Sequence, residues 1–216
     1  MTIFLIGFRA SGKSTLANQF VTKNPLYKLV EMDDLIKSMA GKTITELTQN
    51  GTKWQEFRTI ETQILLEIAQ NSTSQNMIVS CGGGVGVNDI KIESTGPFST
   101  KLLGFYNKNV SDTFGELQEK IIKSTPYSKT IWLNVDKKII AERLKKDYEK
   151  NVNHRPNLQQ NQKLDGFIKD ENNQGISRRV ESDLKVFEGR VKIYQKLADI
   201  TLESNDLIDL AAAISV

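Results

Sequence analysis

The sequence is poor in the features that would place it in several common protein classes. Its 216 residues include one cysteine, Cys81, so no disulfide can form within the chain, and this scarcity favours a reducing compartment. The net charge at neutral pH is only +3. An excess this small does not indicate a nucleic-acid partner.

Long apolar runs are missing as well. No segment approaches the roughly 20 apolar residues that a membrane-spanning helix needs. The stretch IFLIGF near the first residue is too short for the core of a signal peptide, and no basic segment precedes it. We therefore expect a cytoplasmic protein without a membrane partner.

The sequence does contain an alternation of short apolar segments and amphipathic ones. The expected strands are residues 2–6, 27–32, 77–81, 130–135 and 200–202, and the expected helices are 13–21, 35–40, 45–49, 54–69, 137–148, 176–197 and 206–214. Such alternation predicts an α/β fold with a parallel sheet, in which ligands bind beyond the carboxyl ends of the strands. The length suits a single domain over residues 1–216.

Two segments interrupt this pattern. Residues 89–128 show no clear periodicity, although FGELQEKIIK within them is compatible with a helix. Residues 150–175 are rich in asparagine, glutamine and charged residues, which fits either a solvated linker or a mobile lid. We treat the first segment as an insertion and the second as a candidate lid.

The segment GFRASGKS, residues 7–14, matches the phosphate-binding pattern G-x-x-x-x-G-K-[ST]. It follows an expected strand and precedes an expected helix, as the pattern requires. Backbone N–H groups of such a loop and the N-terminus of the helix bind phosphate oxygens. Lys13 is expected to contact the β- and γ-phosphates of a nucleoside triphosphate, and the Ser14 hydroxyl to bind Mg²⁺.

The class of phosphate-loop protein can be narrowed. Asn107-Lys108-Asn109-Val110 lacks the aspartate of the guanine-reading motif N-K-x-D, which disfavours a GTPase. The chain is also short for a motor or a transporter ATPase. Small-molecule and nucleotide kinases remain.

The order of the further motifs resembles that of shikimate kinases. After the phosphate loop come Glu31-Met32-Asp33, Phe57-Arg58 with Glu61, Gly82-Gly83-Gly84, Arg155-Pro156-Asn157-Leu158, and Arg190 with Tyr194. The family has these pieces in the same order, and the matches extend over nearly the whole chain. The resemblance implies a phosphate-loop kinase fold, a three-layer sandwich with a five-stranded parallel sheet between helices and, here, an enlarged lid.

The resemblance also implies an activity, the ATP-dependent phosphorylation of shikimate to shikimate 3-phosphate in aromatic amino-acid synthesis, with Mg²⁺. Arg58 and Arg190 are then expected to bind the substrate's carboxylate, which suits planar guanidinium donors. Asp33 is expected to orient the attacked hydroxyl and to accept its proton. Gly82, Gly83 and Gly84 complete the expected substrate site.

The nucleotide is expected to contact Ala10, Ser11, Gly12, Lys13, Ser14, Thr15 and Arg155. Of these, Lys13 and Arg155 are expected to be catalytic together with Asp33, with Arg155 on the transferring phosphoryl group. Two residues depart from the family's pattern. Ala10 replaces a glycine, which the loop tolerates if its φ angle is negative, and Glu31 replaces an aspartate near the metal, which suggests contact through water.

Other interpretations stay open. A kinase for another small polyol or sugar acid, such as gluconate, would not need both Arg58 and Arg190, and a nucleotide-dependent switch would use the insertions as a partner surface. A monomer is favoured. Single residues also have simpler interpretations: Asp34 as a helix cap, His154 as a solvated loop residue, and Cys81, Trp54 and Trp132 as packing residues.

Overall fold

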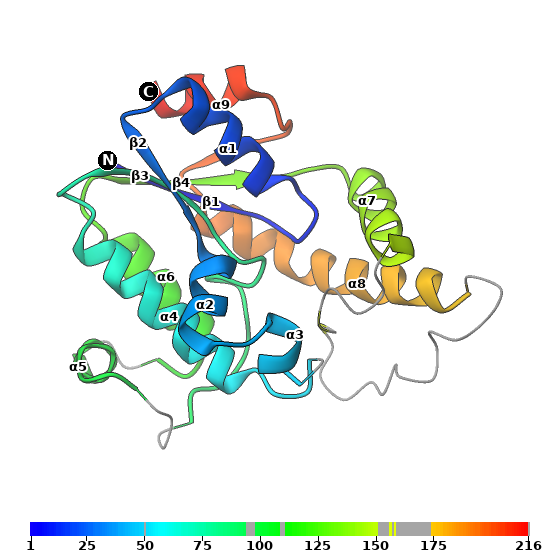
Figure 1. The fold of residues 1–216 in the computed structure, drawn as a ribbon, viewed down its shortest axis with the longest axis horizontal. Helices are drawn as coiled ribbons and strands as arrows, with labels where there is room; N and C mark the ends of the chain where they lie inside the picture. The colour runs from blue at the N-terminus through cyan, green and yellow to red at the C-terminus, as the bar shows by residue number, and fades with distance from the viewer. Residues whose placement is uncertain are drawn as a thin grey trace.

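The computed structural model describes residues 1–49, 51–93, 98–108, 111–150, 156, 158 and 174–215. Its centre is one sheet of five parallel strands in the order β2-β3-β1-β4-β5 (Figure 1). The strands are β1 (Thr2–Ile6), β2 (Tyr27–Glu31), β3 (Asn76–Ser80), β4 (Ser128–Leu133) and β5 (Ile200–Leu202). The α/β fold with a five-stranded parallel sheet is confirmed.

Helices connect and cover these strands. They are α1 (Lys13–Lys23), α2 (Met32–Ala40), α3 (Ile44–Leu47), α4 (Gln55–Gln70), α5 (Thr100–Lys108), α6 (Phe114–Ser124), α7 (Lys137–Lys150), α8 (Gln174–Leu197) and α9 (Leu207–Ser215). None of the described helices is both long and apolar enough to cross a membrane.

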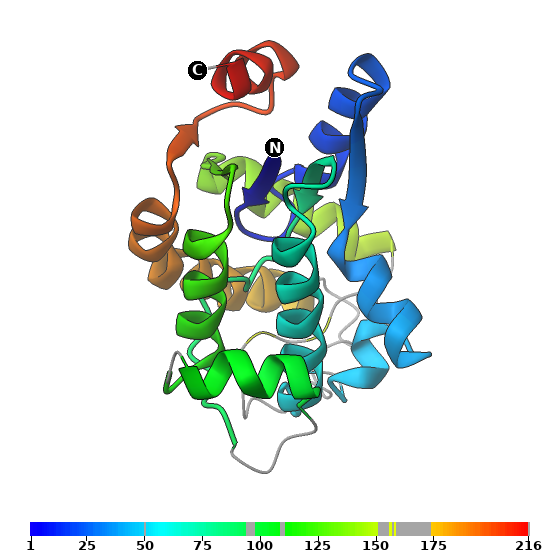
Figure 2. The same ribbon diagram turned by 90° about the vertical axis from the view of Figure 1, so that its left-hand side faces the viewer.

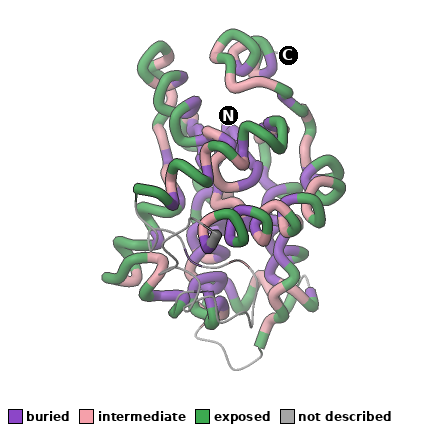
Figure 3. Tube along the Cα trace, turned by 90° about the vertical axis from the view of Figure 1, so that its right-hand side faces the viewer, coloured by how far each residue is buried: buried purple, intermediate pink, exposed green. Residues whose placement is uncertain are grey.

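Strand β1 explains why helices cover both faces of the sheet. Its side chains alternate, with Phe4 and Ile6 in one apolar cluster and Ile3 and Leu5 in the other, and all four are fully buried. A strand that is apolar on both faces requires a helical layer on each. Helices α2, α4 and α6 supply the first layer, α1, α7 and α9 the second, and α8 contributes to both clusters. Figure 3 shows the result as a mostly buried centre of the trace with exposed segments around it.

The segment that the sequence left without a pattern contains two helices. Helix α6 covers the stretch FGELQEKIIK, and its start is fixed by a capping box in which Thr113 and Glu116 each bond the other's backbone N–H. Helix α5 was not expected. It crosses in front of α4 and α6 in the view of Figure 2 and packs against α4. It buries Leu102 completely, while its other side chains are partly or fully exposed.

The topology determines where a ligand site forms. Strand β1 lies between β3 and β4, so the chain leaves the centre of the sheet in the phosphate loop and leaves the adjacent strand in the three glycines. Because both strands run in the same direction, the two loops meet at one edge of the sheet. His154 and Arg155 lie outside the described residues, so their predicted positions stay predictions.

Candidate active site

The phosphate loop joins β1 to α1 with an unusual backbone. Gly12, the N-cap of α1, has a φ angle of 96°, and Ala10 has a φ angle of 62°. The condition of a negative φ, under which an alanine is tolerated here without strain, is therefore not met. The loop needs the left-handed conformation at this position, which costs an alanine about 1 kcal/mol or more because its β-carbon crowds the following carbonyl.

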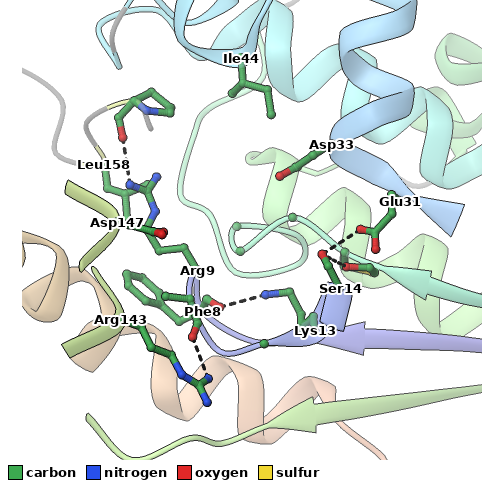
Figure 4. Close-up of a pocket in the computed structure, with 18 of the residues that line it drawn as sticks. Phe8, Arg9, Lys13, Ser14, Glu31, Asp33, Ile44, Arg143, Asp147 and Leu158 are labelled. Carbon is green, nitrogen blue, oxygen red and sulfur yellow. Dashed lines mark hydrogen bonds between the residues drawn. The ribbon is translucent and has the colours of Figure 1, made fainter. Parts of the chain in front are cut away.

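The side chain of Lys13 folds back over the phosphate loop. Its Nζ donates to the carbonyl oxygen of Phe8 at 2.9 Å (Figure 4). It also donates to the carbonyl oxygen of Gly7 at 2.8 Å and lies 3.3 Å from Oγ of Ser11. The side chain is buried, and Ser11 is completely so. The ammonium group is thus held at the mouth of a loop whose N–H groups and helix N-terminus favour an anion.

Three oxygen-bearing side chains meet beside the loop. Oγ of Ser14 lies 2.9 Å from Oε2 of Glu31 and 3.1 Å from Oγ of Ser80, which is the last residue of β3. Burial raises the pKa of Glu31, and the charges of Asp33 and Asp34 add to this rise, while the two serine hydroxyls oppose it. Oε1 of Glu31 is buried and has no hydrogen-bond partner among the described residues.

This set of hard oxygen donors, with one oxygen unsatisfied, fits Mg²⁺. No cluster of three or more His, Cys, Asp or Glu side chains that could hold a metal occurs among the described residues. A site of one carboxylate and hydroxyls agrees with the usual way of binding Mg²⁺, in which substrate phosphates and water complete the coordination. Sequence reasoning missed Ser80, for which the only signal was a polar residue at the end of an apolar strand.

Two further residues hold the outer side of the loop. Nη1 of Arg143, on α7, donates to the carbonyl oxygens of Ala10 and Ser11, both at 3.1 Å. Nδ2 of Asn205 donates to Ser11 O at 2.6 Å, and a β-carbon at Gly12 would collide with this amide. Both residues line the same cavity as Lys13. The sequence gave no signal for either, because their partners are more than 130 residues away.

Arg58 lies on the second turn of α4, across the site from the phosphate loop. Its Nη1 forms an ion pair with Oε2 of Glu61, and its guanidinium lies 4.9 Å from the ring centroids of both Trp54 and Phe57. Arg58 and Glu61 are almost completely buried. Nε of Arg58 and Oε1 of Glu61 have no hydrogen-bond partner among the described residues. A buried, rigid fork with unused donors is suited to a carboxylate ligand.

The three glycines after β3 leave space for the side chains of Arg58 and Glu61 and for the backbone of the phosphate loop. A β-carbon at Gly82 would lie 2.6 Å from Oε1 of Glu61, and one at Gly84 would collide with the guanidinium of Arg58. At Gly83 it would lie 2.9 Å from the backbone nitrogen of Arg9, within the phosphate loop. The two glycine-rich loops are therefore in direct contact, and a side chain at Gly84 would displace Arg58.

Arg190 approaches the same loop from α8. Its Nη1 donates to Gly83 O at 2.9 Å, and the Tyr194 hydroxyl donates to the same oxygen at 2.5 Å. Burial lowers the pKa of Arg190, and Arg58 and Arg9 lower it further, although Tyr194 acts in the other direction. Burial also raises the pKa of Tyr194 to about 12. Several guanidiniums so close together favour an anionic ligand.

Asp33 and Asp34 behave differently although they are neighbours. Asp33 lines the cavity and points into it, near Gly82 (Figure 4). Asp34 is paired with Lys37 at 2.6 Å on the exposed side of α2 and does not cap the helix, whose N-cap is Glu31. Of these two aspartates, Asp33 is the one available to a ligand.

These residues line one cavity of about 880 Å³. It brings together the predicted Ala10, Gly12, Lys13, Ser14, Thr15, Glu31, Asp33, Arg58, Gly82, Gly83, Gly84 and Arg190. Ser11 lies beneath it as a partner of Lys13. Cys81 is buried and its pKa is raised well above the ordinary range by burial, as expected of a packing residue. Trp132 stacks on Tyr194, whereas Trp54 both packs and lines the cavity.

Comparison with known proteins agrees with this geometry. The family model for shikimate kinase matches residues 9–95. A shikimate kinase of Clostridium botulinum strain 657 is 31% identical over 166 residues, which cover 72% of this chain and 91% of the relative. The chain belongs to the shikimate kinase family.

Alignments with other shikimate kinases cover different shares of the two chains. A shikimate kinase from Clostridium botulinum strain Eklund 17B is 38% identical over 92 residues, which span only about half (52%) of that relative and 43% of this chain. Among solved structures, a shikimate kinase from Acinetobacter baumannii in complex with shikimate aligns with 99% of this chain and 90% of its own, with a TM-score of 0.63 and 18% identity. This last likeness concerns the fold alone.

Proposed function

We propose that this protein transfers the γ-phosphoryl group of ATP to a hydroxyl group of shikimate. The observation that carries the proposal is the placement of Arg58 and Arg190, on two different helices, at the glycine loop that touches the phosphate loop. A carboxylate held between them would present the rest of a small ring to Asp33 and to the phosphates. Membership of the shikimate kinase family supports the choice of substrate.

The chain's own residues have distinct tasks in this reaction. The phosphate loop and Lys13 bind the phosphates, with Ser11, Gly12 and Thr15 contributing backbone or hydroxyl donors, while Arg143 and Asn205 keep the loop in shape. The substrate hydroxyl oxygen forms a bond to the γ-phosphorus as the bond to the β,γ-bridging oxygen breaks. The carboxylate of Asp33 accepts the hydroxyl proton, and ADP leaves with the bridging oxygen.

Ser14, Glu31 and Ser80 are the residues that would hold Mg²⁺. When bound, this ion neutralises charge on the β- and γ-phosphates. Arg155 stays a proposed contact of the transferring phosphoryl group because it lies outside the described residues. Binding and positioning are the protein's main contribution, since phosphoryl transfer demands little covalent chemistry from it.

ADP release tests the proposal. The protein is incubated with ATP, Mg²⁺ and either shikimate, gluconate or no acceptor, and Lys13→Ala, prepared identically, controls for contaminating kinases. Stimulation by shikimate alone is expected. Stimulation by gluconate alone would assign the site to another acid, and slow hydrolysis that no acceptor changes would favour a nucleotide-dependent switch.

A further inference from the structure

Gln118 is a completely buried side chain on α6, within the segment 89–128. Its Nε2 donates to Oε2 of Glu61 and to Oγ1 of Thr62, both at 2.9 Å. Its Oε1 accepts from the backbone nitrogen of Gly86 and from Nδ2 of Asn88, both at 3.0 Å. Because the Gly86 N–H can only donate, the orientation of the amide is determined, and all four of its hydrogen-bonding positions are used.

The partners of Gln118 belong to the two walls of the substrate site. Glu61 forms the ion pair with Arg58, and Thr62 Oγ1 donates to the carbonyl of Arg58 at 2.6 Å. On the other wall, Nδ2 of Asn88 also donates to Gly84 O at 3.0 Å. One amide therefore joins the helix that carries Arg58 to the loop that continues from the three glycines.

The close approach of α6 is itself built into the sequence. A β-carbon at Gly115 would collide with the backbone carbonyl of Asn88. Glycine at this position lets the helix pack directly on the loop, which brings Gln118 within reach of both walls. The capping box at Thr113 and Glu116 fixes where this turn of helix begins.

We propose that Gln118 is a positioning residue for the carboxylate of the acidic substrate. By donating to Glu61, it holds the group that orients the guanidinium of Arg58, and by accepting from Gly86 and Asn88, it sets the distance of the glycine loop from that guanidinium. The inference rests on the proposed function and gives the helix of the inserted segment a part in substrate binding. Gln118 acts through Glu61 and does not touch the substrate.

A purely structural glutamine would behave differently when changed. Its loss would lower stability and would weaken the binding of both substrates alike. A positioning residue for Arg58 affects the acidic substrate selectively, because the proposed nucleotide site is formed by Lys13 and the phosphate loop, which Arg143 and Asn205 hold on the other side of the cavity.

The decisive variant is Gln118→Glu. It keeps the size of the side chain and an acceptor for Gly86 and Asn88, but above the pKa of the new carboxyl it places a second carboxylate against Glu61. We expect the Kd for shikimate, measured by calorimetry at pH 8, to rise about 10-fold or more, since a charged group loses its donor and meets a like charge. The Kd for ATP should stay within about 2-fold.

The pH profile separates positioning from a general loss of structure. Once protonated, the new carboxyl group of Gln118→Glu donates to Glu61 as the amide does, so the shikimate affinity of the variant should approach that of the wild type as the pH is lowered. Glu119→Gln, at the next and partly exposed residue of the same helix, is the matched control and should bind shikimate as the wild type does. Gln118→Leu, which removes all four bonds, should lose shikimate binding at every pH.

The proposal is overturned if the folded variants bind shikimate as tightly as the wild type across the pH range, or if they lose affinity for both substrates equally. If the wild type itself does not bind shikimate, the proposed function is wrong, and the crystal structure of Gln118→Leu then decides the inference. Displacement of Glu61 and Arg58 would support positioning, and an unmoved pair would refute it.

Discussion

Oγ of Ser14 donates to Oε2 of Glu31 at 2.9 Å, which joins the first turn of α1 to the end of β2. This bond places a half-buried carboxylate beside the phosphate loop. Burial raises the pKa of Glu31, so the folded state binds this proton more tightly than the unfolded chain does. The free energy of unfolding must then fall as the pH rises from 4.5, the ordinary pKa, through the raised value.

Replacing Glu31 tests this sign. We expect Glu31→Gln, without metal or nucleotide, to melt at a higher temperature than the wild type at pH 7 and at the same temperature below pH 4.5. Glu46 provides a control of opposite sign, because its bonds with Thr43 lower its pKa, so Glu46→Gln should lose stability only above the pKa of that group. A difference between Glu31→Gln and the wild type that does not depend on pH would contradict the account.

Arg9 and Asp183 form a buried ion pair that anchors the phosphate loop. Nη1 of Arg9 lies 3.5 Å from Oδ2 of Asp183 and donates to Pro156 O at 3.0 Å, and the Tyr148 hydroxyl donates to the same carboxylate. Arg9→Met should destabilise the fold by about 3 kcal/mol, because it leaves Asp183 buried without its counter-charge.

Urea unfolding of the single variants and of Arg9→Met/Asp183→Leu measures this pair. The double variant should be less destabilised than the sum of the single ones, since neither charge is then left alone. Additive losses would show that the two side chains do not interact energetically.

The left-handed conformation of Ala10 predicts an unusual response to glycine. Ala10→Gly should leave the stability unchanged or raise it by up to ~1 kcal/mol, because relief of the strained backbone offsets the greater freedom of the unfolded chain. Ala212→Gly, on the exposed side of α9, should instead cost about 1 kcal/mol. Chemical denaturation compares the two, and an equal loss in both would argue against strain at Ala10.

Changes on the two sides of the cavity should affect the KM values of different substrates. Arg58→Lys should raise the KM for shikimate by ~10-fold or more, because lysine cannot offer the planar pair of donors. Arg143→Ala should raise the KM for ATP instead, since the carbonyls of Ala10 and Ser11 lose their donor. A coupled assay with each substrate varied in turn separates these effects, and variants that changed both constants equally would argue against separate subsites.

Local sequence signals predicted much of the fold. The phosphate loop and the strand and helix beside it were recognisable because their pattern depends on a few adjacent residues with special backbone requirements. Helix α5 was missed because it is short, contains Gly104 and buries only Leu102 completely, so its sequence did not stand out from the irregular segment around it. The positive φ angle of Ala10 could not be predicted from the sequence motif either, because the geometry of the loop overrides the preference of alanine for negative φ.

The residues missed in the site share a different cause. Ser80, Arg143, Asn205 and Gln118 act through partners that are far away in the sequence, and nothing in their own neighbourhoods distinguishes them. The motif residues Lys13, Asp33, Arg58 and Arg190 were found because a family pattern names them, and the structure brings them to one cavity. Their roles in binding and catalysis are proposals that the kinetic experiments above address.

Identification of the product tests the central claim most directly. The protein is incubated with ATP, Mg²⁺ and shikimate, and both ADP and phosphorylated shikimate are quantified by mass spectrometry, with Lys13→Ala as the control. The account predicts one phosphorylated shikimate for each ADP formed, and neither product above background with Lys13→Ala. ADP formed without phosphorylated shikimate, or no reaction by a folded protein that binds ATP, would contradict it.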